Sequence, residues 1–371
     1  MRVRWGGIGV VLLAIVAGGA LLAAVTPMGR YLARGAWAEA KILSRRQSIA
    51  RLAADSATPS AMRAKLQLVL EARRFAVDSL GLPAKNAFTQ FSRLDHDTLV
   101  LVLSGAQRDW LRPVTWWFPV VGNVPYKGFF DFEEAKREED EMQVRGYDTY
   151  LRPSPAFSTL GFFNDPLLST TLNDDSLEIV NTVIHELTHN RFYAKGHAVF
   201  NESFASFVGA RGAERFFRAR GDTASARRVA ARWDDDLLLG AVWERTYAAL
   251  DSAFRAHPDE SPRGERQLDS ARAARLAARD TIYSRTRALL VDSVGPRLKT
   301  IGPSYAARVR LDNAALLARR IYATGLPDFE AAWVRDDRDL RRAIERIVAI
   351  ARGSPEAPGD AVRRWTERSP P

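Results

Sequence analysis

The sequence predicts an α+β fold that is predominantly α-helical. Apolar residues recur at helical spacing over residues 31–82 and again over residues 225–350. Runs typical of β-strands are short and fall between these two regions. The chain has 371 residues, of which 46% are hydrophobic, so it can bury a large core. We expect residues 31–224 and 225–352 to form one domain, followed by a disordered tail over residues 353–371.

In the first half of the chain, each expected element follows from a local pattern. The stretch AMRAKLQLVLEARRFAVDSLGL (61–82) carries its apolar side chains on one helical face. The run DTLVLVLSG (97–105) is typical of a strand that ends at a glycine. The aromatic stretch 115–131 is interrupted by Pro and Gly, which favours an ordered loop with a short strand. A helix is expected over residues 132–146, and a short strand over residues 147–152.

The second half is expected to be mostly helical. Residues 153–170 come first and show little periodicity, as in long structured loops, which often carry function. Asp175, with Glu178 three residues later, resembles a capping box that opens a helix. The helical pattern of residues 225–350 is interrupted at residues 257–265 and near residues 295–303.

The N-terminus contains an uncharged apolar run, WGGIGVVLLAIVAGGALLAAV (5–25). A run of this length can cross a bilayer as one helix. It is longer than the core of a typical signal peptide and lacks an Ala-x-Ala cleavage site. The sequence therefore predicts that residues 1–30 form a membrane anchor with one transmembrane helix. We expect the rest of the chain to be exported to the periplasmic or extracytoplasmic side.

Charge and cysteine content exclude several functions. The net charge of +10 comes largely from Ala/Arg-rich helical stretches such as LDSARAARLAARD (268–280). Acidic residues are interleaved with the basic ones and no nucleic-acid-binding motif accompanies them, so we expect solvated helix faces and no nucleic-acid partner. The chain has no cysteine, which excludes disulfides, thiol catalysis and cysteine-rich zinc sites.

The stretch IHELTHNRFY (184–193) carries the main chemical signal. His185 and His189 are four residues apart, so both imidazoles lie on one helix face and can reach a single ion. Glu186 lies about 100° further round the helix and could meet a water molecule held by that ion. The alternative is a solvated helix face with two unrelated histidines. The chain has only five His, and two of them occur at this spacing.

A catalytic zinc site needs a third protein ligand and one open position. Without cysteine, that ligand must be His, Asp or Glu. Glu202 is one candidate, since it shares a predicted helix face with the small residues Ser206 and Gly209, which allow close helix packing. A carboxylate in such an apolar setting is unusual unless it has a partner; its other explanation is a helix-end Glu stabilised by the macrodipole. His197, in a glycine-bearing turn, is the rival third ligand.

Several motifs together resemble a known family. These motifs are VIHELTHNRFYAKGHAVFNESFASFVG (183–209), WWFPVVGNVPYKGFF (116–130), AFSTLGFFNDPLL (156–168) and LDNAALL (311–317). They resemble a bacterial family of zinc aminopeptidases, gluzincin-like, over roughly residues 31 to 335. The resemblance implies a zincin-like metallopeptidase core that binds one Zn²⁺ ion and hydrolyses peptide or protein substrates.

The resemblance also implies roles for individual residues. His185, His189 and Glu202 would bind the zinc ion, and Glu186 would be the catalytic base. Family members often have cysteines where this chain has Trp117 and Asn123, so no disulfide is available there. Many members resemble lipoproteins, whereas this chain has no cysteine to carry a lipid.

Other roles are less well specified by the sequence. Gluzincin helices often carry Asp four residues after the glutamate ligand, a position that is Ser206 here, so another group must orient the first histidine. Tyr126 and Tyr305 are candidate donors to the oxyanion by residue type only, and the alternative for each is an aromatic side chain that packs in the core. Asp165 is a candidate for binding a substrate ammonium group, or a turn-forming residue before proline.

Three functions remain compatible with these residues. The family resemblance favours an aminopeptidase, although the Gly-x-Met-Glu-Asn segment of well-known gluzincin aminopeptidases is absent. A zinc endopeptidase has the same chemistry. A non-catalytic binding protein that keeps the zincin fold is the third interpretation. An intramembrane protease is excluded because Asn181, Asn190 and Arg191 make the motif helix polar.

Overall fold

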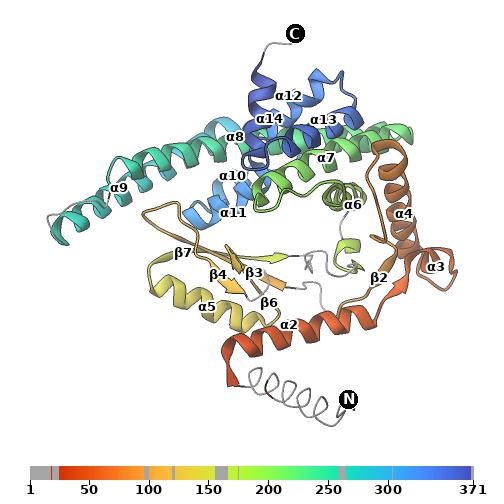
Figure 1. Ribbon diagram of the computed structural model, residues 1–371, viewed down its shortest axis with the longest axis horizontal. Coiled ribbons are helices and arrows are strands. Elements are labelled where there is room, and N and C mark those ends of the chain that lie inside the picture. Colours follow the sequence, from red (N-terminus) through yellow and green to blue (C-terminus); the bar gives the residue numbers. More distant parts are fainter. Residues whose placement is uncertain are drawn as a thin grey trace, which may run out of the picture.

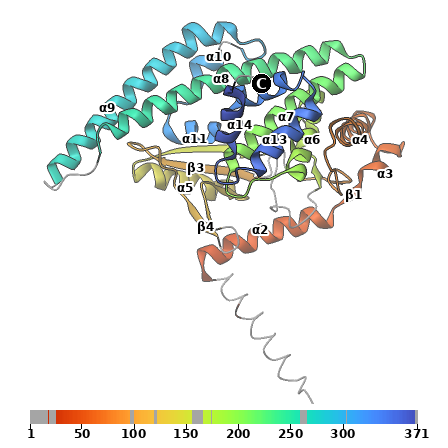
Figure 2. The same cartoon turned by 45° about the horizontal axis from the view of Figure 1, so that its top comes forward.

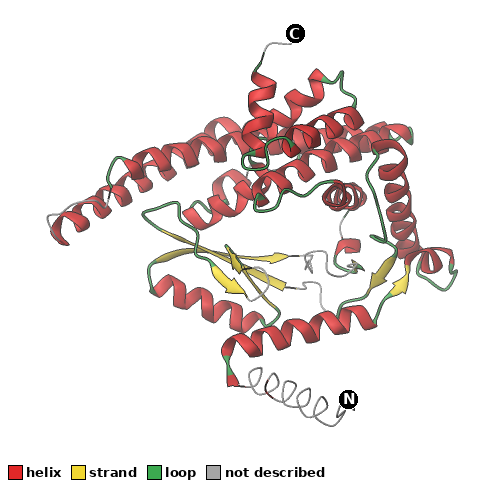
Figure 3. Cartoon of the chain, viewed as in Figure 1, coloured by secondary structure: helices red, strands yellow, loops and turns green. Residues whose placement is uncertain are grey.

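The computed structural model describes residues 18, 25–95, 100–118, 122–154, 166–173, 175–258, 265–302 and 304–368. These residues form a mostly helical fold with three small sheets (Figures 1 and 3). The α-helices are α2 (Pro27–Ser44), α3 (Ile49–Ala54), α4 (Ser60–Leu80), α5 (Phe132–Val144), α6 (Ser176–Arg191), α7 (Ala198–Ala219), α8 (Thr223–Arg255), α9 (Glu265–Leu289), α10 (Ser304–Arg308), α11 (Asn313–Ala323), α12 (Leu326–Arg335), α13 (Leu340–Arg352) and α14 (Pro358–Glu367). Short helical turns are η1 (Thr171–Asn173), η2 (Leu290–Val294) and η3 (Gly295–Arg297).

The strands are short and mostly antiparallel. They are β1 (Gln47–Ser48), β2 (Gln90–Ser92), β3 (Val100–Gln107), β4 (Trp116–Phe118), β5 (Gly122–Val124), β6 (Lys127–Phe129), β7 (Tyr147–Ser154) and β8 (Leu167–Leu168). The sheets have the orders β1-β2-β8, β6-β3-β7 and β4-β5. Strands β3 and β7 pair along their whole length, from Val100 opposite Ser154 to Gln107 opposite Tyr147.

Helices α6 and α7 lie at the centre of the helical body, between the sheets and the outer helices (Figures 1 and 2). One large core joins them to α4, α8, α12 and α13. Its centre is aromatic: Phe207 of α7 packs against Trp233 of α8 and Phe329 of α12, with ring centroids 6.2 and 5.9 Å away. Helices α8 and α9 run side by side and project from the body (Figure 2).

A buried cluster of hydrogen-bonded polar residues connects strands β3 and β7 to helices α9 and α11. Asp148 of β7 accepts hydrogen bonds from Arg279 of α9 (2.6 Å) and from the backbone N–H of Asn313 (3.0 Å). The Asn313 side chain donates to the carbonyl oxygen of Gln107 at the end of β3 (2.8 Å). Asp312 caps α11, so the LDNAALL stretch holds this helix against the β6-β3-β7 sheet.

No helix in the described ranges is both long and apolar enough to cross a membrane. The long helices are amphipathic: α2, for example, carries Arg30, Arg34 and Lys41, and charged side chains at that density are costly in a bilayer. On this finding the predicted transmembrane helix is wrong, and so is the membrane-anchored, exported localisation drawn from it. Of the apolar run 5–25 itself, only residues 18 and 25 are among the described residues.

The end of the chain also differs from the expectation. Residues 353–371 were expected to be a disordered tail, but residues 358–367 form helix α14. This helix packs against α12 and α13, with Val362 fully buried in the main core. Arg335 of α12 donates hydrogen bonds to the carbonyl oxygens of Trp365 and Arg368, which fixes the end of α14. The proline and glycine content of this segment predicts disorder, but residues 358–367 form a helix because its apolar face packs against the core.

Asp175 caps the first turn of α6 as the sequence predicts, whereas the Glu178 carboxylate, the other half of the expected capping box, contacts Asn181 and Arg232. The Asp175 carboxylate accepts hydrogen bonds from the backbone N–H groups of Leu177 (3.0 Å) and Glu178 (2.9 Å). It also pairs with Arg232 of α8. The hydrogen bond from Arg232 is the main cause that lowers the pKa of Asp175 from 3.8 to about 2. Asp175 therefore stabilises both the helix start and its contact with α8.

We expect Asp175→Ala to lower the free energy of unfolding by about 1 kcal/mol, since it removes the cap. Asp175→Asn should cost less because an amide oxygen can still cap the helix. Because the folded-state pKa is lowered, the ion pair stabilises the protein above about pH 4, and its contribution is lost as the pH falls toward about 2. Denaturant unfolding curves should therefore show the difference between wild type and Asp175→Asn shrinking over that range. A constant difference would contradict this interpretation.

Candidate metal centre

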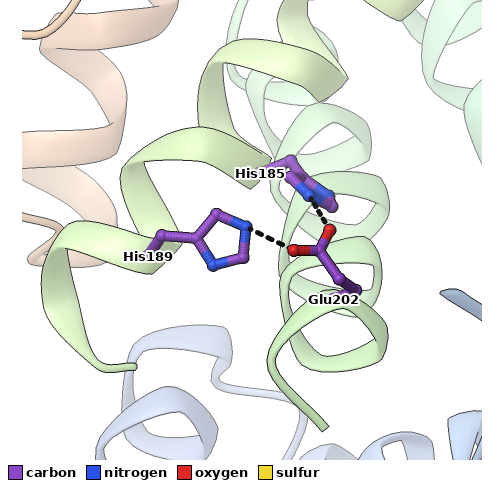
Figure 4. Close-up of side chains that lie close together, drawn as sticks. All are labelled: His185, His189 and Glu202. Carbon is purple, nitrogen blue, oxygen red and sulfur yellow. Dashed lines mark hydrogen bonds and ion pairs between the residues drawn. The ribbon is translucent and has the colours of Figure 1, made fainter. Parts of the chain in front are cut away.

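Three side chains from α6 and α7 converge on one point (Figure 4). His185 Nε2 lies 3.3 Å from Glu202 Oε2, and His189 Nε2 lies 3.6 Å from Glu202 Oε1. Both histidines project from α6, one turn apart, and Glu202 faces them from the second turn of α7 (Figure 4). Among the described residues, these three form the group of His, Asp and Glu side chains that could hold a metal ion.

The turn between α6 and α7 is fixed by a buried asparagine. Asn201 Oδ1 accepts a hydrogen bond from the backbone N–H of Ala194, and its Nδ2 donates to the carbonyl oxygen of Ala194, both at 2.8 Å. Only 2% of Asn201 is exposed. Gly196, with a φ of +84°, supplies the left-handed conformation within this turn. The position of Glu202, the next residue after Asn201, is therefore set by backbone geometry.

Glycine allows α6 and α7 to approach closely beside the metal group. A Cβ added at Gly209 would lie 3.1 Å from the carbonyl oxygen of Asn181 and 3.2 Å from His185 Cβ. The same added Cβ would lie only 2.6 Å from Oδ1 of the Asn181 side chain. The small residues expected at this face thus do allow close packing, and the backbone of α7 touches the α6 turn that carries His185.

The geometry of the donor atoms fits a tetrahedral zinc ion. Zinc binds His nitrogen and carboxylate oxygen at about 2.0–2.1 Å, which places neighbouring donors roughly 3.3 Å apart. The two histidines lie 3.3 and 3.6 Å from different oxygens of the Glu202 carboxylate, which is close to this value. All donor atoms of the group lie within 4.8 Å of one another. Two imidazoles and one carboxylate leave one position open, as in catalytic zinc sites.

The electrostatics of the group reflect a shared site. Burial lowers the pKa of His189 to about 4, with a further contribution from His185, so His189 is neutral at neutral pH. Burial also opposes charge on His185, but the hydrogen bond with Glu202 and the charge of Glu186 outweigh it and raise its pKa. Burial raises the pKa of Glu202, and the two histidines more than reverse this, so it stays ionised. His189 and Glu202 therefore have the forms that bind metals, a neutral imidazole and an ionised carboxylate, whereas a metal ion would have to displace the proton that Glu202 favours on His185.

The remaining motif residues occupy distinct positions. Glu186 is exposed on α6, directly after His185, and its charge acts on that imidazole. His197 is the residue that precedes α7 and is not part of the metal group. Ser206 donates a hydrogen bond to the backbone carbonyl of Glu202 (2.8 Å), so its hydroxyl stays on its own helix.

Tyrosines and an arginine surround the group on its other side. Burial and the negative charge of Glu202 raise the pKa of Tyr126, between β5 and β6, and of Tyr322 on α11. Arg152 of β7 acts on both hydroxyls and on Glu202. The Tyr193 ring lies 6.0 Å from the His189 ring. Tyr126 was a candidate from the sequence, whereas the other residues were missed. Tyr193 lies four residues after His189, so the motif itself could have indicated it. Tyr322 and Arg152 are far from the motif in the sequence, and no local pattern indicates them.

Two other candidates from the sequence do not join this group. Tyr305 is partly buried beside the core formed by α8, α9 and η2. Burial is the main cause that raises its pKa, and the charged groups that act on it, Arg319 and Asp236, are not part of the metal group. Asp165 lies outside the described residues, so its expected contact with a substrate ammonium group stays a prediction.

We expect Gly209→Ala to weaken metal binding about 10-fold, although Gly209 is not a ligand. The added methyl group would push the α6 backbone away by a few tenths of an ångström and separate His185 from Glu202. Gly359→Ala is the matched control, since the nearest atom to its added Cβ is 3.8 Å away. Competition with a chromogenic chelator would measure both affinities. Equal affinities in both variants would show that close helix packing does not set the ligand geometry.

Comparison with known proteins places this chain. The model of the family described as "Putative aminopeptidase" matches residues 30–360, which include both helices of the metal group. No curated protein and no solved structure gives a significant match. Since the family model covers most of the 371 residues, the chain belongs to the "Putative aminopeptidase" family.

Proposed function

We propose that the protein is a zinc-dependent peptidase, and an aminopeptidase in particular, that hydrolyses peptide bonds with an activated water molecule. The convergence of His185, His189 and Glu202, with Glu186 exposed beside them, carries the proposal. Membership of the family supports a peptide or protein substrate and release of N-terminal residues.

In this proposal, His185, His189 and Glu202 hold one zinc ion. The bound ion would supply a Lewis acid that polarises the scissile carbonyl and lowers the pKa of a water molecule. Glu186 accepts the proton of the attacking water and passes it to the leaving amine. Its exposure, in contrast to the partly buried histidines one residue before and three after it, leaves its carboxylate accessible to substrate.

The tyrosines beside Glu202 suit the remaining task of stabilising the oxyanion. Such a donor must stay protonated and lie near the carbonyl oxygen. The raised pKa values of Tyr126 and Tyr322 keep both hydroxyls protonated at neutral pH. Each keeps about two fifths of its surface exposed, at 42% and 41%. Both are therefore protonated donors that a substrate can reach.

The metal assignment is tested with the whole chain. We expect the protein to purify with about one equivalent of zinc, and His185→Ala, His189→Ala and Glu202→Gln to lose most of it, because three ligands are needed to complete the site. His197→Ala is the matched control and should keep its zinc. Elemental analysis and circular dichroism would measure metal content and folding. Zinc retained in Glu202→Gln but lost in His197→Ala would reassign the third ligand.

The catalytic role is tested at Glu186. Glu186→Gln keeps the shape of the side chain but cannot accept a proton, so kcat should fall roughly 100-fold or more while zinc content is unchanged. Peptides with free and with acetylated amino termini should be compared, since an aminopeptidase cleaves only the first kind. Unchanged turnover in the variant would exclude Glu186 as the base, and cleavage of both kinds of peptide would replace the aminopeptidase by an endopeptidase.

A further inference from the structure

A cavity of about 870 Å³ lies next to the metal group. Its walls come from α6, α7, α8 and the segment that follows η3. This volume lies within the range of about 300–1,000 Å³ that is typical of ligand sites. The roles proposed for the metal group and Glu186 do not use this cavity.

The cavity begins one helical turn away from the metal group on both α6 and α7. Asn181 lines it from α6, one turn before His185, and Ser206 lines it from α7, one turn after Glu202. Asn181 and His185 both lie against Gly209 of α7, so they share one face of α6. One helical turn is about 5.4 Å, and an extended peptide advances about 3.3 Å per residue. A substrate residue roughly one to three positions from the scissile bond therefore reaches the cavity.

Basic side chains outnumber acidic ones on the cavity wall. Its acidic members are Glu178 and Asp236. Its basic members are Arg227, Arg228, Arg232 and Lys299. Arg232 already pairs with Asp175 and, at 3.8 Å, with Glu178, while Lys299 pairs with Asp234 at 2.5 Å.

Arg227 and Arg228 differ from the other two cations. Within the described parts of the chain, no carboxylate or other acceptor lies within bonding distance of either guanidinium. Both residues are exposed on α8 and line the cavity, where only two other lining residues are acidic. Exposed guanidinium groups favour planar carboxylates, which they bind through two parallel hydrogen bonds.

The acidic residues of the wall do not cancel this charge. The Glu178 carboxylate accepts a hydrogen bond from Asn181 (3.1 Å) and faces Arg232. Asp236 lines the cavity and is itself exposed, so solvent screens its charge. Even with Asp236 ionised, four basic side chains face two acidic ones on the wall, so the balance of charge among the lining residues is positive.

We infer that this cavity is a subsite for a carboxylate of the peptide substrate, held by Arg227 and Arg228. The inference rests on the proposed peptidase function and deepens it, because it names the chemistry of the preferred substrate. The carboxylate can belong to an Asp or Glu side chain near the scissile bond, or to the C-terminus of a short peptide. A lysine or arginine side chain would meet Arg227 and Arg228 instead and be disfavoured.

The test uses short peptides with free amino termini. One series is amidated at the C-terminus and carries Glu, Gln or Lys at successive positions; a second series carries Gln and a free C-terminal carboxylate. We expect the Arg227→Gln/Arg228→Gln double variant to raise KM about tenfold for the peptides that carry the carboxylate. Gln peptides with an amide end, kcat and zinc content should be unaffected. Arg245→Gln, an exposed arginine of α8 outside the cavity wall, is the matched control.

Binding separates this inference from the proposed function. The same peptides, labelled with a fluorophore, are titrated into Glu186→Gln with and without the two arginine substitutions. A loss of about tenfold in affinity that is confined to carboxylate-bearing peptides supports the subsite, and the series that shows it identifies the source of the carboxylate. Equal affinity for Glu and Gln peptides, or a preference that survives the double substitution, overturns it. Absence of hydrolysis by the wild-type protein would overturn the peptidase proposal alone.

Discussion

The close contact between helices α6 and α7 is the constraint on which the metal group depends. The ligands lie on two helices, so their separations follow from how near the two backbones come. Gly209 permits this contact at the turn of α6 that carries His185. Gly212 permits it in the core, since a Cβ added at Gly212 would lie 2.8 Å from Ile184 Cγ2. Asn201 then fixes the turn that joins the helices. These backbone features define the ligand geometry before any ion is bound.

The remaining elements are attached to this helix pair by buried polar contacts. Ser203, next to Glu202, donates to the carbonyl oxygen of Ile321 and accepts from the N–H of Thr324, which ties α7 to the end of α11 that carries Tyr322. Two turns further along α7, Arg211 makes a bidentate pair with Glu330 of α12 (2.7 Å for each bond), and Trp233 donates to the same carboxylate. Such charge-assisted contacts are directional, so they fix orientation where apolar packing alone would allow sliding. The end of α11 that carries Tyr322 is thereby held in a defined position relative to Glu202.

The convergence of His185, His189 and Glu202 could be predicted from the sequence because its signals are local. His185 and His189 are related by helix periodicity, and the small residues after Glu202 indicated the close packing that the structure shows. The helical majority and the Asp175 cap were also predictable, since propensity and capping act over a few residues. Tyr322 and Arg152 could not be found, because α11 and β7 are brought to the site by long-range contacts such as the Asp148–Asn313 hydrogen bond. Helix α14 was missed because packing of Val362 overrides a composition that favours disorder.

The short connection between α6 and α7 has a consequence for the order of folding. His185 and Glu202 are only 17 positions apart, whereas the strands β2 and β8 pair residues from well-separated parts of the chain. The entropy lost on closing a loop grows with its length, and local contacts form faster than distant ones. We therefore expect the hairpin of α6 and α7, which carries His185, His189 and Glu202, to assemble before the sheets are complete. A metal ion that binds this hairpin and not the unfolded chain would lower the free energy of an intermediate as well as that of the native protein.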